Sequence, residues 1–126
     1  NTWTLINDSS EALNYANGRT RLTAVTSPVQ NDEVAWDVIL AAGTWEFTLH
    51  HRKSSNVGIY TVTLGSISVG TIDGYSASAA VGLDTISSIA IPTASKYRLK
   101  LQMATKNASS SGYVGNIQVI SLRRTA

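Results

Sequence analysis

Lys96-Tyr-Arg-Leu-Lys-Leu-Gln-Met103 is the stretch of the sequence whose pattern decides the fold. Apolar and polar residues alternate along its whole length, and the apolar ones are Tyr97, Leu99, Leu101 and Met103. Successive side chains of a β-strand point to opposite faces of a sheet. The pattern therefore predicts a strand with one face in a hydrophobic core and the other in water.

The same period of two occurs in seven further segments, which predicts eight strands. The predicted strands cover residues 20–26, 34–40, 44–51, 57–64, 67–72, 85–91, 96–103 and 113–122. Only a short turn with Ala42 and Gly43 separates the second segment from the third, so we expect those two strands to form a hairpin. Segment 57–64 has two apolar or β-branched faces, which favours a place inside a sheet. The one candidate helix, Ser9–Ala16, is two turns long, and a loop is the equal alternative.

The composition agrees with a β-rich domain whose polarity comes from hydroxyl groups. Only 14% of the 126 residues are charged, 43% are hydrophobic, and the chain has 16 Ser and 14 Thr. A helical bundle needs a more charged surface, and a disordered chain has fewer large apolar residues. We predict one domain over residues 1–126, with residues 1–30 as an N-terminal segment of uncertain structure.

The predicted fold is a two-sheet antiparallel β-sandwich of the jelly-roll type, with an immunoglobulin-like sandwich or a closed barrel as alternatives. Its expected core consists of Trp36, Val38, Leu40, Trp45, Phe47, Leu49, Tyr60, Val62, Leu64, Ile91, Tyr97, Leu99, Leu101, Ile117 and Val119.

The sequence offers no constellation of residues that is typical of an enzyme. It has no cysteine, so it has neither disulfides nor thiolate metal sites. His50 and His51 are neighbours on a strand and point to opposite faces, which prevents joint binding of one metal. We expect His51 to be hydrogen-bonded in the core and His50 to lie at the surface. Without a Gly-x-Ser-x-Gly turn, a nucleotide-binding glycine loop or paired carboxylates, we predict a non-enzymatic protein with no cofactor and no metal.

Charged residues suggest one candidate surface. The net charge of +2 is too small to predict a nucleic-acid partner, and the apolar runs are too short for membrane insertion. Lys96, Arg98 and Lys100 form a basic row on the wet face of their strand. The row is either a solvated face, an edge strand that lysine protects from further pairing, or a stripe that meets an acidic glycan or a neighbouring subunit.

Aromatic residues near predicted turns are the candidate ligand-binding residues, because the apolar face of a sugar ring needs a flat partner. Tyr15, Tyr75 and Tyr113 meet this description, and each has a packed corner residue as its alternative interpretation. Asn107, which begins the polar loop before Tyr113, is the fourth candidate.

Two stretches together resemble jelly-roll domains of bacteriophage particle proteins, such as those of tail fibres, tailspikes and capsid decorations. They are Asp37-Val-Ile-Leu-Ala-Ala-Gly-Thr-Trp-Glu-Phe-Thr-Leu49 and Gly58–Tyr75, which ends in Gly70-Thr-Ile-Asp-Gly-Tyr75. The closing order of Tyr97–Leu101, Lys106–Tyr113 and Ile117–Leu122 is similar to the C-terminal part of the same domains. A looser likeness, based on the Gly-Thr-Trp strand, is to the sandwich carbohydrate-binding modules of polysaccharide-degrading enzymes.

The phage resemblance implies a structural or attachment protein on the virion surface. Such a protein decorates the capsid or fibre or binds a host-surface glycan, and it is a homotrimer among other virion subunits. The looser likeness implies the alternative, a free-standing carbohydrate-binding module of an extracellular polysaccharide-acting protein. An enzyme is the third hypothesis.

Overall fold

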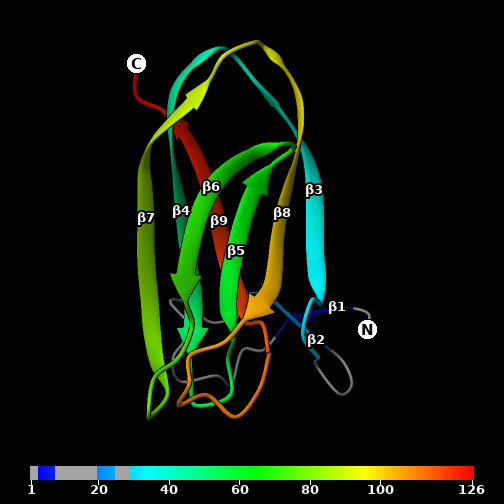
Figure 1. The fold of residues 1–126 in the computed structure, drawn as a ribbon, viewed down its shortest axis with the longest axis vertical. Helices are drawn as coiled ribbons and strands as arrows, with labels where there is room; N and C mark the ends of the chain where they lie inside the picture. Colours follow the sequence, from blue (N-terminus) through cyan, green and yellow to red (C-terminus); the bar gives the residue numbers. More distant parts are fainter. Residues whose placement is uncertain (1–2, 8–19, 25–28) are drawn as a thin grey trace.

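The strand that decides the fold lies inside a sheet, with a partner on each side. We describe the protein from a computed structural model, which places residues 3–7 and 20–24 as backbone and residues 29–126 in full (Figure 1). The strands are β1 (Trp3–Asn7), β2 (Thr20–Ala24), β3 (Glu33–Leu40), β4 (Gly43–Lys53), β5 (Ile59–Leu64), β6 (Ile67–Asp73), β7 (Ala80–Ile91), β8 (Ser95–Thr105) and β9 (Ile117–Arg124). One sheet has the order β1-β2-β9-β4-β7 and the other the order β3-β8-β5-β6.

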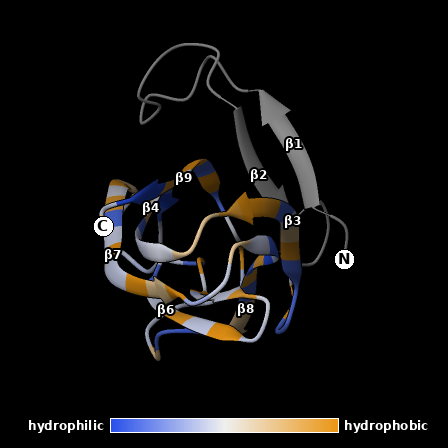
Figure 2. Ribbon diagram, turned by 90° about the horizontal axis from the view of Figure 1, so that it is seen from above, coloured by the Kyte–Doolittle hydropathy of each residue, from blue (hydrophilic) through white to orange (hydrophobic). Residues whose placement is uncertain are grey.

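The sequence-based fold class is confirmed as an antiparallel β-sandwich. The pairs formed by strands β1 to β9 are antiparallel, and Figure 2 shows β4 and β9 lying opposite β6 and β8. All eight predicted strands are present, and β1 is an additional one that was not predicted. In the described residues no helix is long and apolar enough to cross a membrane. The candidate helix Ser9–Ala16 lies outside the described residues.

The prediction that β3 and β4 form a hairpin is wrong. β3 pairs with β8 in the four-stranded sheet, whereas β4 pairs with β7 and β9 in the other sheet. The chain therefore crosses between the sheets after Leu40, so that the apolar faces of both strands meet in the core. Gly43 (φ 146°) begins β4 beside the C-terminus, where an added Cβ would lie 2.5 Å from the carbonyl oxygen of Ala126.

A two-residue hairpin does occur between β5 and β6. Leu64 and Ile67 are paired, and Gly65 and Ser66 form the loop between them. Gly65 has a φ of 58°, the left-handed conformation that glycine adopts at low cost. The hairpin places β5 between β6 and β8, which confirms the prediction of a strand inside a sheet.

The core fills the space between the two sheets. Its fully buried hydrophobic residues are Leu40, Phe47, Leu49, Val57, Tyr60, Val62, Leu64, Ile72, Ile89, Ile91, Leu99, Leu101, Met103 and Ile117. Of the other predicted core residues, Trp36, Val38, Trp45 and Tyr97 are half-buried and pack against this cluster.

Val119 was wrongly assigned to the core. The pairing of β9 with β4 shifts register between His50 and His51, so that Ile117 pairs with His51 but Val119 pairs with His50. Such a bulge reverses the inside and outside positions on the far side of the irregularity. Ile120 and Leu122 consequently pack on the core.

Candidate functional site

Three loops meet at one end of the sandwich, the lower end in Figure 1, and we call this region the loop end (residues 54–58, 73–79 and 105–116). Backbone hydrogen bonds join the loops. The amide of Ser54 donates to the carbonyl of Gly74 (3.3 Å), and the amide of Val114 donates to the carbonyl of Asn56 (3.0 Å). The amide of Ser111 donates to the carbonyl of Ser55 (2.9 Å). These hydrogen bonds hold the three loops of the loop end in fixed positions relative to one another.

Asp73, the last residue of β6, connects two of the predicted ligand-binding residues. Its Oδ1 accepts the backbone amide of Tyr75 at 2.9 Å, and its Oδ2 accepts Nδ2 of Asn107 at 2.9 Å. The Oδ1 of Asn107 in turn accepts the amide of Ser109 at 3.0 Å. Two residues that lie far apart in the sequence are thus held by one carboxylate.

Tyr113 lies in the same region and is half-buried against the core. The Nζ of Lys106 lies 5.5 Å from the centroid of its ring, within the range of a cation–π interaction. The same ammonium donates to the carbonyl of Ser110 at 3.1 Å, and the Ser110 hydroxyl donates to the carbonyl of Val57 at 2.8 Å. Tyr113 therefore packs against the core and also lies at the loop end. Lys106 is held beside its ring.

The fold places three of the four predicted ligand-binding candidates in this region, namely Tyr75, Asn107 and Tyr113. Tyr15 lies outside the described residues. Asp73 and Lys106 were not predicted as site residues. The only sequence signal for Asp73 was its position before Gly74 at the end of a strand, which is typical of a turn.

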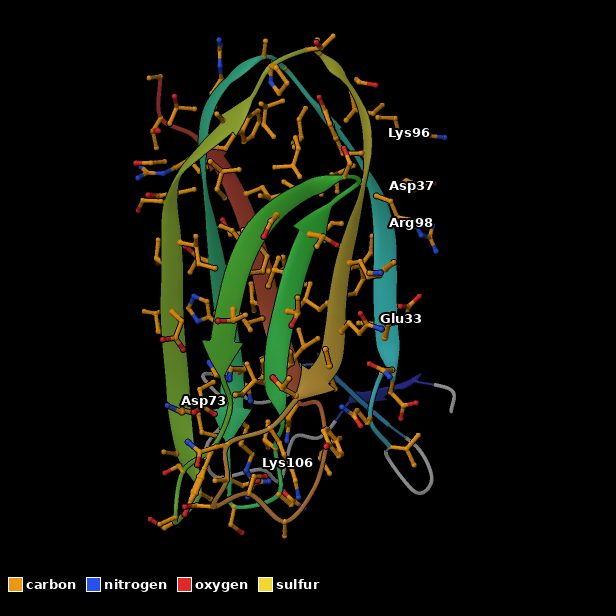
Figure 3. All side chains as sticks on the ribbon, viewed as in Figure 1. Glu33, Asp37, Asp73, Lys96, Arg98 and Lys106 are labelled. Carbon is orange, nitrogen blue, oxygen red and sulfur yellow. The ribbon has the colours of Figure 1, made fainter. Side chains whose placement is uncertain are left out.

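The charged side chains of the basic row lie beside acidic side chains of the neighbouring strand. Lys96 and Arg98 lie 3.9 and 3.5 Å from the carboxylate of Asp37, and Lys100 lies 3.6 Å from that of Glu33 (Figure 3). Both carboxylates come from β3, which pairs with β8. The alternative of an edge strand is wrong, because β8 lies between β3 and β5.

Two basic residues differ from this row, namely Lys106 in the loop end and Lys53 just before it. In the fully described part of the chain, neither Lys53 nor Lys106 has a carboxylate oxygen within 4.0 Å. Lys53 ends β4 and pairs in register with Ala80, at the start of β7. An anionic ligand that reaches the loop end meets these two charges without first displacing an ion pair.

His51 points into the core, as predicted from the sequence. Its side chain is fully buried, its Nε2 lies 2.6 Å from Oδ2 of Asp84, and its ring meets that of Tyr60 edge-on at 5.5 Å. Burial lowers the pKa of His51, and the Asp84 carboxylate offsets only part of this effect. Above pH 6.5 the imidazole is therefore neutral, and in the tautomer with its proton on Nε2 it donates to the carboxylate. Gly82 leaves room for the ring, since a Cβ there would lie 2.5 Å from Nε2. His50 is half-buried rather than exposed, which corrects its predicted surface position.

The buried polar side chains of His51 and Tyr60 form hydrogen bonds within the protein. Burial raises the pKa of Tyr60, whose hydroxyl oxygen accepts the amide of Asn116 at 2.8 Å. Because His51 and Tyr60 are fully buried, no substrate atom reaches them in this structure.

Over the residues that the structure describes, no group of three or more His, Asp or Glu side chains is arranged to hold a metal ion.

The chain is similar to solved structures that include the following two. Xanthan lyase from Paenibacillus matches with 28% identity and a TM-score of 0.75, over 98% of this chain but only 12% of that chain. The CBM36-1 domain of a multidomain xylanase, from the hindgut metagenome of Trinervitermes trinervoides, matches with 19% identity and a TM-score of 0.64. That alignment covers 99% of both chains. No protein-family model and no curated protein sequence matches the chain.

These similarities agree with the looser likeness to carbohydrate-binding sandwich modules, and they do not support the likeness to phage particle domains. At 19% identity the xylanase domain shows a common fold alone, which is the sandwich already described. The chain spans about an eighth of the xanthan lyase, so the similarity is to one segment of that larger protein.

Proposed function

We propose that this domain is a non-catalytic carbohydrate-binding module of an extracellular, polysaccharide-acting protein. The likeness over 98% of the chain to a segment of xanthan lyase is the observation that carries the proposal. Such a module holds its protein on the polysaccharide, so that a second site on the same polypeptide works at a raised local concentration of substrate. This function replaces the virion role, which neither of these two similar structures supports.

The ligand binds at the loop end in this proposal. Tyr75 and Tyr113 supply flat apolar surface there, and Asn107 supplies an amide whose position Asp73 fixes. Lys106, and Lys53 just before the loop end, supply positive charge, and neither has an acidic partner among residues 29–126. This combination fits an acidic polysaccharide better than a neutral one, because a carboxylate on a sugar forms charge-assisted hydrogen bonds with an ammonium group.

Isothermal titration calorimetry with xanthan, and with xylan as the neutral comparison, tests the proposal. We expect binding of xanthan that weakens as salt is added, since the interacting charges lie near the surface. Lys106→Gln should weaken the affinity about tenfold, the value of one charge-assisted hydrogen bond. Tyr75→Ala should also weaken it.

Lys96→Gln is the matched control, because it removes an equal charge from the basic row, where Asp37 is the partner. It should leave the affinity within about twofold of the wild type, a few tenths of a kcal/mol. Binding of neither polysaccharide would reject the function. An equal effect of the Lys96 and Lys106 substitutions would reject the loop end as the site.

A further inference from the structure

Asp73 is an exposed carboxylate that is held in place at the loop end. Its Oδ1 accepts the amide of Tyr75, and its Oδ2 accepts Nδ2 of Asn107, both at 2.9 Å. The next residue, Gly74, is packed so closely that a Cβ there would overlap the side chain of Val57. A ligand therefore meets a carboxylate whose position needs little further ordering, which lowers the entropic cost of binding.

The carboxylate of Asp73 retains room for hydrogen bonds with a ligand. Each of its oxygens accepts one N–H group, whereas an ionised carboxylate offers about four acceptor sites. Among residues 29–126 no charged nitrogen of a basic side chain lies within 4.0 Å of these oxygens, so the charge is not used in an ion pair. One acceptor site therefore remains on each oxygen.

Asn107 adds a donor beside these acceptors. Its Oδ1 accepts the amide of Ser109 at 3.0 Å, which fixes the orientation of the side-chain amide. Its Nδ2 carries two hydrogens and donates one of them to Asp73, so the second remains for a ligand. Together the two residues offer two acceptor sites and one donor.

We propose that Asp73 and Asn107 bind a vicinal diol, which is a pair of hydroxyl groups on neighbouring ring carbons of a sugar. Both hydroxyls donate to the carboxylate of Asp73, one to each oxygen, and one of them also accepts the second hydrogen of Asn107. A hydroxyl has one donor and two acceptor sites, so these bonds form together. The bonds to the carboxylate are charge-assisted and therefore strong. The diol site is part of the proposed carbohydrate-binding site and rests on that function.

The charges of the loop end set the orientation of an acidic sugar. A sugar carboxylate is repelled by Asp73 and attracted by Lys106, the residue before Asn107. Figure 3 shows Asp73 and Lys106 at the same end of the sandwich. The bound unit therefore places its free neighbouring hydroxyls at Asp73 and its acidic group toward Lys106. The ligand class is an acidic polysaccharide with an unsubstituted vicinal diol.

Selective cleavage of the diols in xanthan tests the proposal. Periodate breaks the carbon–carbon bond between two neighbouring free hydroxyls and leaves the sugar carboxylates in place. Xanthan that has been oxidised in this way and then reduced with borohydride therefore keeps its charge but loses its vicinal diols. Calorimetry should show that the wild-type protein binds intact xanthan at least about tenfold more tightly than the oxidised form, since charge-assisted hydrogen bonds are lost.

Asp73→Asn should abolish this preference, because the variant lacks the carboxylate that accepts both hydroxyls. Its affinities for intact and oxidised xanthan should agree within about twofold. Lys106→Gln should weaken the binding of both forms by a similar factor and keep the preference, since its ammonium group meets the sugar carboxylate. Asp37→Asn is the matched control, because it removes an equal charge beside the basic row, and it should keep both the affinity and the preference.

Asn107→Ala is the second variant, to be used if thermal unfolding shows that Asp73→Asn does not fold. It leaves Asp73 and its bond to Tyr75 in place and should lower the preference for intact xanthan by a factor on the order of three. Equal binding of both forms by the wild type, or an unchanged preference in a folded variant of Asp73 or Asn107, would overturn the diol site and leave the carbohydrate-binding function standing. Binding of neither form would reject both.

Discussion

At the scale of single residues, the alternation of side chains predicted burial wherever a strand is regular. Leu99 and Leu101 are inside and Lys96 and Arg98 outside, as the pattern on β8 indicated. Val119 was misplaced because a bulge is a feature of pairing between two strands, and neither strand alone carries a signal for it. The hydrogen bond between His51 and Asp84 likewise required the pairing of β4 with β7.

Leu99→Ala should lower the free energy of unfolding by about 2–5 kcal/mol. The side chain is 2% exposed, so the substitution removes buried methyl groups and leaves a cavity. Chemical denaturation measures the loss. Ile39→Ala, on an 84% exposed residue, should change stability by less than about 0.5 kcal/mol. Similar losses from both variants would contradict the assignment of faces.

We expect the free energy of unfolding to fall in mild acid because of His51. Burial lowers its pKa in the folded state below the ordinary value of 6.5, so at lower pH the unfolded chain binds the proton more readily. The stabilisation is present above pH 6.5 and declines as the pH falls from there toward the pKa of the folded state. Urea denaturation at pH 8, 6 and 5 follows the decline.

His51→Gln should flatten this part of the pH profile, whatever its effect on stability at pH 8. His50→Gln is the matched control, because it replaces the neighbouring half-buried histidine and leaves the His51–Asp84 hydrogen bond in place, and it should retain the wild-type slope. The opposite pattern in the two variants would show that another group controls the acid response.

At the scale of elements, the sequence predicted which segments are strands but not how they pair. Propensity and alternation are local properties, whereas the choice between a hairpin and a crossing of sheets depends on where distant partners lie. The expected hairpin of β3 and β4 failed for that reason. β1 was not predicted because its five residues are too few to show a clear alternation of apolar and polar side chains.

The β5–β6 turn should depend on the conformation of Gly65. Gly65→Val should cost about 1–2 kcal/mol, because a β-branched residue is strained at a φ of 58°. The nearest atom to an added Cβ is Cδ1 of Tyr97 at 3.8 Å, so crowding does not explain a loss. Gly65→Asn should cost less, since asparagine adopts this conformation more readily. Thermal unfolding compares the two, and equal losses would contradict the backbone argument.

At the scale of the whole molecule, the sequence suggested Tyr75, Asn107 and Tyr113 as ligand-binding candidates without showing that they lie at the same end of the sandwich. Tyr75 and Asn107 come from different loops, and only the fold places both at Asp73. The charges illustrate the same limit, since the sequence left several interpretations of the basic row open and did not show that β3 places acidic side chains beside it. Function was harder still to predict, because sandwich domains serve many purposes and the likeness to phage domains concerned strand order rather than a site.

The C-terminus lies at the far end of the sandwich from the loop end (Figure 1), where the backbone of Ala126 is bonded to that of Thr44 in both directions. Immobilisation through a C-terminal linker would therefore hold every molecule on a sensor chip or bead with the same orientation. Polysaccharide added in the flow would reach Tyr75 and Lys106 without obstruction from the support.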